Sequence, residues 1–106
     1  MERQEFLRRA DECLERVVRA LEPLDPDEVD FDSADGVLTL EFADRTRYVL
    51  NRQTATNQMW FAAGARAWHY DFDATRDAWL DEKDGHELFG RVSESIAGKT
   101  GRAVAI

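Results

Sequence analysis

The side chains best suited to chemistry are carboxylates that crowd one stretch of the chain. Between Arg19 and Arg45 there is no Lys or Arg, and nine of the 22 acidic residues occur there: Glu22, Asp25, Asp27, Glu28, Asp30, Asp32, Asp35, Glu41 and Asp44. Carboxylate oxygens are hard ligands that suit Mg, Ca, Mn and iron ions. A bound cation would relieve the repulsion among these acids. The charge alone leaves a second interpretation open, a solvated acidic face that keeps the protein soluble.

The remainder of the chain is close to neutral, so the formal net charge of −8 belongs to this single stretch. A ligand or partner therefore meets the acidity as a local patch. A chain with this balance would bind a phosphate backbone only through a local basic patch, and we expect no nucleic acid among its partners.

Other reactive side chains are sparse. Cys13 is the single cysteine, and because an iron–sulfur cluster usually needs four thiolates, the chain holds no cluster of its own. Cys13 falls in an apolar stripe, which predicts burial. His69 and His86 show no metal-ligand spacing, and a metal or haem role for an exposed His69 is a minor alternative. No Ser-His-Asp order, glycine-rich phosphate loop or HExxH motif occurs.

The elements that position these residues follow from hydrophobic periodicity. Apolar residues at three- and four-residue steps predict an N-terminal helix that ends near Leu21 or Glu22, before Pro23 and Pro26. A second helix is expected from about His86 to Ala97, with Asp84 as its cap, Glu87 completing a capping box and Gly98 ending it. Alternating residues predict strands between the helices at 28–32, 37–42, 47–51, 58–62, 68–72 and around Trp79.

This order predicts an α+β, two-layer sandwich in one domain, residues 1–106. The N- and C-terminal helices pack on one face of a five- to six-stranded antiparallel sheet. If Tyr48, Leu50, Met59 and Phe61 face the helices, then Val49, Asn51, Gln58 and Trp60 face away. An outward Trp beside amides and Arg52 is typical of a binding surface. The alternative is a register shifted by one residue, which would place Trp60 in the core.

Nothing in the sequence indicates a membrane or an export route. No apolar run approaches the ~20 residues that a membrane span needs. The first residues mix arginines with acids, unlike a transit peptide, and a lone cysteine suits a reducing compartment. We therefore expect a cytoplasmic protein.

Several segments resemble the frataxin family, and most closely its bacterial, CyaY-type branch. They are Glu5-Phe6, Ala10-Asp11, residues 36–42, Asn51-Arg52-Gln53 within 48–53, Gln58-x-Trp60 within 58–62, and Trp68-His69-Tyr70-Asp71-Phe72 before a lone Trp79. The resemblance covers nearly the full length and is weakest in the C-terminal tail. It implies the same two-layer sandwich that the patterning predicts.

The resemblance also implies two sites. Iron would bind weakly along an acidic ridge of the first helix and first strand, at Asp11, Glu15, Glu22, Asp25, Asp27, Glu28, Asp30 and Asp32. Relatives often carry acids where this chain has Val18 and Arg19, so the ridge is weaker at the helix end. The cysteine desulfurase and the scaffold protein of cluster assembly would meet the sheet surface at Asn51, Arg52, Gln53, Gln58 and Trp60. The ridge would also dock on a basic desulfurase surface.

The function expected from these features is an iron-binding regulator of iron–sulfur cluster assembly that holds Fe²⁺ or Fe³⁺ weakly and reversibly. We expect a monomer that forms oligomers with iron. Two alternatives stay open. One is an acidic interaction or inhibitor module without a metal role. The other is a weak ferroxidase, less favoured because no Glu-x-x-His di-iron motif is present.

Overall fold

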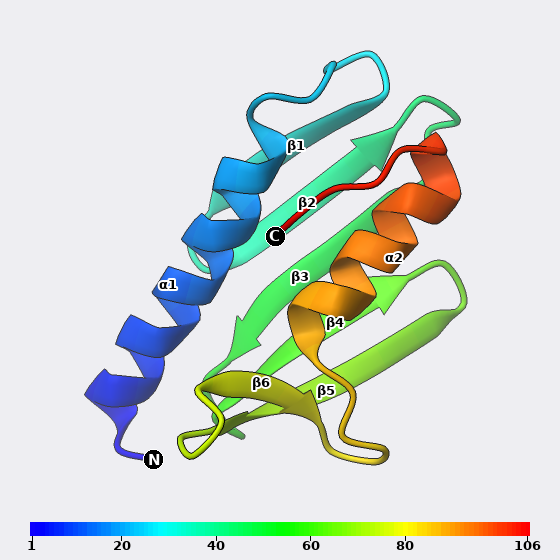
Figure 1. The fold of residues 1–106 in the computed structure, drawn as a ribbon. Helices are drawn as coiled ribbons and strands as arrows, with labels where there is room; N and C mark the ends of the chain where they lie inside the picture. Colours follow the sequence, from blue (N-terminus) through cyan, green and yellow to red (C-terminus); the bar gives the residue numbers. More distant parts are fainter.

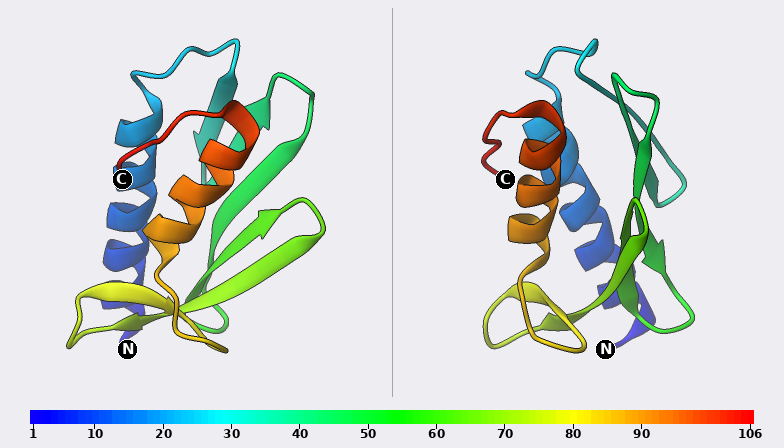
Figure 2. Two further views of the ribbon diagram at one scale, coloured as in Figure 1. Left: turned by 45° about the vertical axis from the view of Figure 1, so that its right-hand side comes forward. Right: turned by 90° about the vertical axis from the view of Figure 1, so that its right-hand side faces the viewer.

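The computed structural model describes residues 1–106 as two layers, with both helices on one face of an antiparallel sheet (Figures 1 and 2). Strand order in the sheet follows the chain from β1 to β6. The predicted two-layer α+β fold is confirmed. The elements are α1 (Arg3–Leu21), β1 (Val29–Ala34), β2 (Val37–Phe42), β3 (Arg47–Gln53), β4 (Gln58–Ala63), β5 (Arg66–Asp73), β6 (Ala78–Asp81) and α2 (Leu88–Thr100).

Helix α1 forms because its apolar residues recur on one face while charged residues cover the other. The Glu2 side chain caps its start by accepting a hydrogen bond from Glu5 N at 2.8 Å. Its end before Pro23 agrees with the prediction. The buried stripe consists of Phe6, Ala10, Cys13, Leu14, Val17 and Leu21.

The sheet is an antiparallel meander, in which short turns join neighbouring strands. At the first hairpin Asp35 and Gly36 have φ values of 54° and 78°, the pattern of a two-residue turn that favours Gly. Strand alternation places Leu38, Leu40 and Phe42 toward the helices, as predicted, and the register continues that inner layer through Leu50, Phe61 and Tyr70.

Helix α2 differs from its prediction at both ends. Glu87, not Asp84, is its cap, because the Glu87 carboxylate accepts from Phe89 N at 2.7 Å and Gly90 N at 2.9 Å. Asp84 instead accepts from His86 N inside the preceding loop. The helix runs through Gly98 and ends at Gly101, whose φ of 74° supplies the left-handed residue that ends a helix.

One core lies between the layers and collects apolar side chains from both helices and all six strands, counting the half-buried ones at its margin. Beyond α2, the tail passes back between the helices (Figure 1), and Val104 and Ile106 pack on the core. Neither α1 nor α2 combines the length and apolar character that a membrane-crossing helix requires.

Candidate functional site: an acidic edge and a Trp60 face

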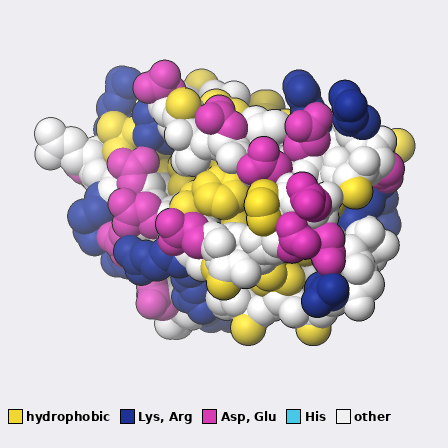
Figure 3. All heavy atoms as spheres, turned by 90° about the horizontal axis from the view of Figure 1, so that it is seen from above, with side chains coloured by type: hydrophobic (Ala, Val, Ile, Leu, Met, Phe, Trp, Pro, Cys, Tyr) yellow, Lys and Arg dark blue, Asp and Glu magenta, His cyan; other side chains and the backbone are white.

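The eight carboxylates of the expected ridge come from one side of the molecule. Asp11 and Glu15 lie on α1, Asp30 and Asp32 lie on the edge strand β1, and the remainder lie at or between the ends of these elements. We call this set the acidic edge: Asp11, Glu15, Glu22, Asp25, Asp27, Glu28, Asp30 and Asp32. Seen from the end that carries the α1–β1 loop, acidic side chains surround a small apolar area (Figure 3).

Three members of the acidic edge are already paired with arginines. Asp11 Oδ1 lies 2.9 Å from Arg52 Nη1, Glu15 Oε2 lies 3.4 Å from Arg19 Nη2, and Glu28 Oε1 lies 3.0 Å from Arg102 Nη2. The other five carboxylates have no Lys or Arg nitrogen within 4.0 Å: Glu22, Asp25, Asp27, Asp30 and Asp32. The uncompensated charge is therefore concentrated at the helix end, the loop and β1.

Three acids of the same sequence stretch lie outside this set, and two of them are paired with basic residues. Glu41 Oε2 lies 3.5 Å from Arg47 Nε. Asp44, in the β2–β3 turn, meets Lys99 Nζ at 2.7 Å. Hydrogen bonds from Lys99 and then Thr46 hold the pKa of the Asp44 carboxyl well below its usual range.

Geometry sets how the acidic edge could hold a cation. No three of its carboxylates bring ligand oxygens within 4.8 Å of one another, and most of them are exposed. Hard oxygen donors suit iron and other hard cations, so the donor set fits, but no cage is preformed. Such a surface holds a cation by summed charge, weakly and with strong dependence on salt.

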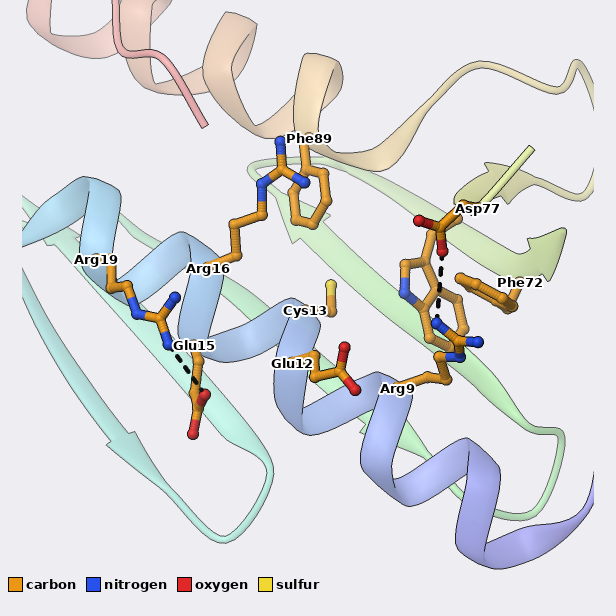
Figure 4. Close-up of a pocket in the computed structure, with 10 residues that line it drawn as sticks. Arg9, Glu12, Cys13, Glu15, Arg16, Arg19, Phe72, Asp77 and Phe89 are labelled. Carbon is orange, nitrogen blue, oxygen red and sulfur yellow. Dashed lines mark hydrogen bonds and ion pairs between the residues drawn. The ribbon is translucent and has the colours of Figure 1, made fainter. Parts of the chain in front are cut away.

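The opposite flank of α1 carries charges of both signs, because Glu12, Glu15 and Asp77 line the same hollow as three arginines. Arg9, Arg16 and Arg19 line a hollow of about 390 Å³ between α1 and α2 (Figure 4). Arg9 lies over the Phe72 ring and Arg16 over the Phe89 ring. Cys13 lies among them, only 2% exposed, and burial raises the pKa of its thiol far above the ordinary value. The predicted burial of Cys13 is confirmed.

The outer face of the sheet centres on Trp60, which faces away from the helices. Its ring stacks on that of His69, its β5 neighbour in the register, with centroids 4.2 Å apart and planes 13° apart. Trp60 Nε1 donates to Gln58 Oε1 at 3.0 Å. The interpretation with Trp60 outside the core is therefore the correct one.

Gln58 holds the Trp60 ring in place through hydrogen bonds to its neighbours. It is 8% exposed, and its amide donates to Asp71 Oδ1 at 3.2 Å and Glu82 Oε1 at 2.8 Å. Asn51 is the β3 neighbour of Trp60, and Gln53 that of Gln58. We call Asn51, Gln53, Gln58 and Trp60 the Trp60 face.

Arg52 does not share that face. Its guanidinium reaches Asp11 on α1 and passes so close to Gly36 that a Cβ there would lie 2.5 Å from Arg52 Nε. The five residues expected to bind partners are thus split: four face outward, and Arg52 joins the acidic edge from the helix side.

Sequence reasoning missed the layer that supports Trp60, formed by His69, Asp71 and Glu82. Pairing the strands in register would have placed His69 and Asp71 beside the motif. It also missed that Asp81, Asp84 and His86 converge in the β6–α2 loop, although the three fall within six residues of each other.

Comparison with known proteins identifies the family. The model of the frataxin-like domain matches residues 1–102. Two relatives are each named iron–sulfur cluster assembly protein CyaY. That of Thioalkalivibrio sulfidiphilus is 34% identical over 102 residues, covering 95% of each chain. That of Dechloromonas aromatica is 36% identical over 107 residues, covering 100% of this chain and 99% of its own.

Solved structures agree. Frataxin from Psychromonas ingrahamii superposes with a TM-score of 0.88 at 30% identity, covering 98% of this chain and 96% of its own. Trimeric frataxin from Saccharomyces cerevisiae, complexed with ferrous iron, superposes with a TM-score of 0.77 at 26% identity, covering 89% and 87%. From the sequence motifs, the two-layer fold and these matches together, the chain belongs to the frataxin family, in its bacterial CyaY-type branch.

Proposed function

We propose that this protein serves iron–sulfur cluster assembly by carrying iron on the acidic edge and by docking the assembly enzymes through the Trp60 face. The observation that carries the proposal is the group of five carboxylates without a basic partner on one edge of the molecule. The names of the relatives and the ferrous iron of the yeast structure support it.

Iron is cargo in this proposal. Exposed carboxylates attract Fe²⁺ or Fe³⁺ through summed charge and supply oxygen ligands, while water fills the remaining positions. Because no cage is preformed, binding is weak and the ion leaves easily. That property suits a protein that passes iron on or responds to its level.

The same charge would attract a basic partner, a cysteine desulfurase with its scaffold protein. Electrostatic attraction speeds encounter, whereas an anchored aromatic supplies affinity. Trp60 is held by His69 and Gln58 before any partner arrives, so little side-chain freedom is lost on docking. In this proposal residues 1–106 act as one domain in the bacterial cytoplasm, as a monomer that assembles further only with iron.

The test of the iron site is a ¹⁵N NMR titration with Fe²⁺ under strict anaerobiosis, at low and high salt. Resonances of the acidic edge should broaden selectively, and salt should weaken the effect. The triple variant Asp27→Asn, Asp30→Asn and Asp32→Asn should lose most of it. A control with the same charge change, Glu12→Gln, Asp77→Asn and Glu94→Gln, should retain it.

If millimolar Fe²⁺ leaves the acidic edge unchanged, the metal part of the proposal is wrong, and a metal-independent acidic interaction module remains. The docking part is tested separately by Trp60→Ala. This variant should keep the fold and lose about 2 kcal/mol or more of desulfurase binding, the size expected for an aromatic hot spot. Val37→Ala, an exposed neighbour on the same side of the sheet, is the matched control.

A further inference from the structure

The loop between β6 and α2 brings three metal-ligating side chains together, far from the acidic edge. Asp81, Asp84 and His86 each offer one ligand atom, and these atoms lie within 4.8 Å of one another. Backbone hydrogen bonds from Asp81 N to His86 O at 2.8 Å and from Gly85 N to Asp81 O at 3.0 Å close the loop. In Figure 1 this loop lies at the opposite end of the molecule from the α1–β1 loop.

Asp81 is the unusual member, because its carboxylate is buried without a cation. It is only 7% exposed, and no Lys or Arg nitrogen lies within 4.0 Å of it. Its Oδ2 atom accepts from Lys83 N at 2.9 Å and Asp84 N at 3.0 Å. Oδ1 has no protein donor and is not a fully buried unsatisfied atom, so it is open to solvent or to an ion. Burying a carboxylate without a compensating charge is costly, and a metal ion would supply that charge.

His86 is held in the orientation that a metal ligand needs. Its side chain is 19% exposed, and Nδ1 faces Asp84 Oδ1 at 2.6 Å. Its other nitrogen, Nε2, lies 2.7 Å from the Tyr70 hydroxyl and 3.4 Å from Arg91 Nε. Metal-ligating histidines are commonly fixed in this way by a hydrogen bond at the second nitrogen.

An ion has a route to the cluster. Asp81 and Asp84 line a hollow of about 390 Å³ at the surface, together with His69 and Glu82. The Asp84 side chain is 65% exposed, so it is free to move from its short contact with Nδ1 to the wider spacing of two ligands on one ion. Arg66 and Lys83 also line the hollow, but neither reaches within 4.0 Å of the two carboxylates.

We propose that Asp81, Asp84 and His86 form a second metal site, for a divalent first-row transition-metal ion. One imidazole nitrogen with two carboxylates suits ions of the Mn²⁺ to Zn²⁺ series better than Mg²⁺ or Ca²⁺, which prefer oxygen alone. When Nδ1 becomes a ligand, the single proton of the neutral His86 imidazole moves from Nδ1 to Nε2 through solvent. Nε2 then donates to the Tyr70 oxygen and gives up the long hydrogen bond from Arg91 Nε. Water occupies the remaining positions.

The first test uses Co²⁺ as the probe, with the wild-type chain and two single variants. Asp84→Asn and Asp81→Asn keep an acceptor oxygen for the loop backbone but lose the charge, and each should weaken Co²⁺ binding at this site about tenfold or more. Asp73→Asn is the matched control, because Asp73 also accepts two backbone N–H groups in a turn yet lies outside the cluster. It should bind Co²⁺ as the wild type does.

The second readout is the ¹⁵N spectrum of the His86 imidazole with Zn²⁺, which should show the proton moving from Nδ1 to Nε2. The triple Asn variant of the acidic edge should leave both signals intact, so failure of the iron proposal and failure of this one are distinguishable. The proposal is overturned if Co²⁺ broadens only acidic-edge resonances. It is equally overturned if Zn²⁺ leaves the His86 tautomer unchanged, or if Asp84→Asn and Asp73→Asn bind Co²⁺ alike.

Discussion

Single residues decide how much of the acidic charge is available, and Arg52 shows this most directly. It neutralises Asp11 from the helix side of the sheet and packs over Gly36, while its neighbours Asn51 and Gln53 face outward. The sequence motif is contiguous, but a strand sends successive side chains to opposite faces. Arg52 therefore does not share one face of the sheet with Asn51 and Gln53, and the role of the three residues in binding partners stays a prediction.

Removing the Arg52 charge should strengthen cation binding at the acidic edge. Arg52→Met keeps much of the packing over Gly36 but leaves Asp11 uncompensated. One extra charge about 4 Å from a cation contributes about 1 kcal/mol in water, so Fe²⁺ or Co²⁺ affinity there should rise by up to about fivefold. Calorimetry at low salt measures this, with Arg52→Lys as the charge-preserving control. Equal affinity in both variants would contradict the prediction.

Cys13 should be inert in the folded protein and should make stability depend on alkaline pH. Burial raises the pKa of the thiol, so the folded state keeps it protonated while the unfolded state ionises near its ordinary pKa of about 8.5. This contribution to stability is complete below that pH and is lost as pH rises above it. Alkylation should be slow without denaturant and fast with it. The free energy of unfolding should fall less steeply from pH 8 to about 10 in Cys13→Ala.

Among the elements, those with a local signal were predicted well. Proline after Leu21 and a continuous apolar stripe set the bounds of α1, and turn residues set the strands. The start of helix α2 was harder to predict. Asp84, followed three residues later by Glu87, fits the capping-box pattern, although the residue that caps the helix is Glu87. Only the loop closed between Asp81 and His86 shows that Asp84 is already engaged. The convergence of Asp81, Asp84 and His86 depends on the same loop. It could not be predicted from the sequence, because the hydrogen bonds that close the loop carry no sequence pattern of their own.

Glu87 should prove to be the residue that starts α2. Glu87→Ala removes the acceptor for two backbone N–H groups and should cost about 1 kcal/mol of the free energy of unfolding, within the usual range for a lost cap. Chemical denaturation measures the cost. The control is Glu94→Ala, an exposed change within the same helix, which should be nearly neutral. A cap at Asp84 would instead make Asp84→Ala the costly change.

At the scale of the whole molecule, the unpaired acids gather on one edge. The hollow between α1 and α2 is lined by three arginines and three acids, which balance, so the net charge of −8 acts from the acidic edge rather than from all sides. The sequence located the acidic stretch, because charge is counted directly. It did not show which acids are neutralised, because their arginines come from distant parts of the chain: Arg52 for Asp11 and Arg102 for Glu28.

Association with a basic partner should therefore be fast and sensitive to salt. Raising ionic strength from about 0.01 M to about 0.15 M shortens the screening length from about 30 Å to about 8 Å. We expect the association rate constant, measured by stopped-flow, to fall about tenfold or more. Trp60→Ala should change mainly the dissociation rate, whereas the triple Asn variant of the acidic edge should change mainly association. The reverse assignment would contradict the division of roles.

The position of the two helices also has a consequence for synthesis of the chain. Neighbouring strands pair in order, so the sheet can assemble hairpin by hairpin as the chain leaves the ribosome. Helix α2 is made after α1 and all six strands, however, and its Leu88, Val92 and Ile96 complete the core shared with α1. The sheet and α1 therefore wait with apolar surface uncovered until residues 88–106 emerge, and during this interval the nascent chain depends most on chaperones.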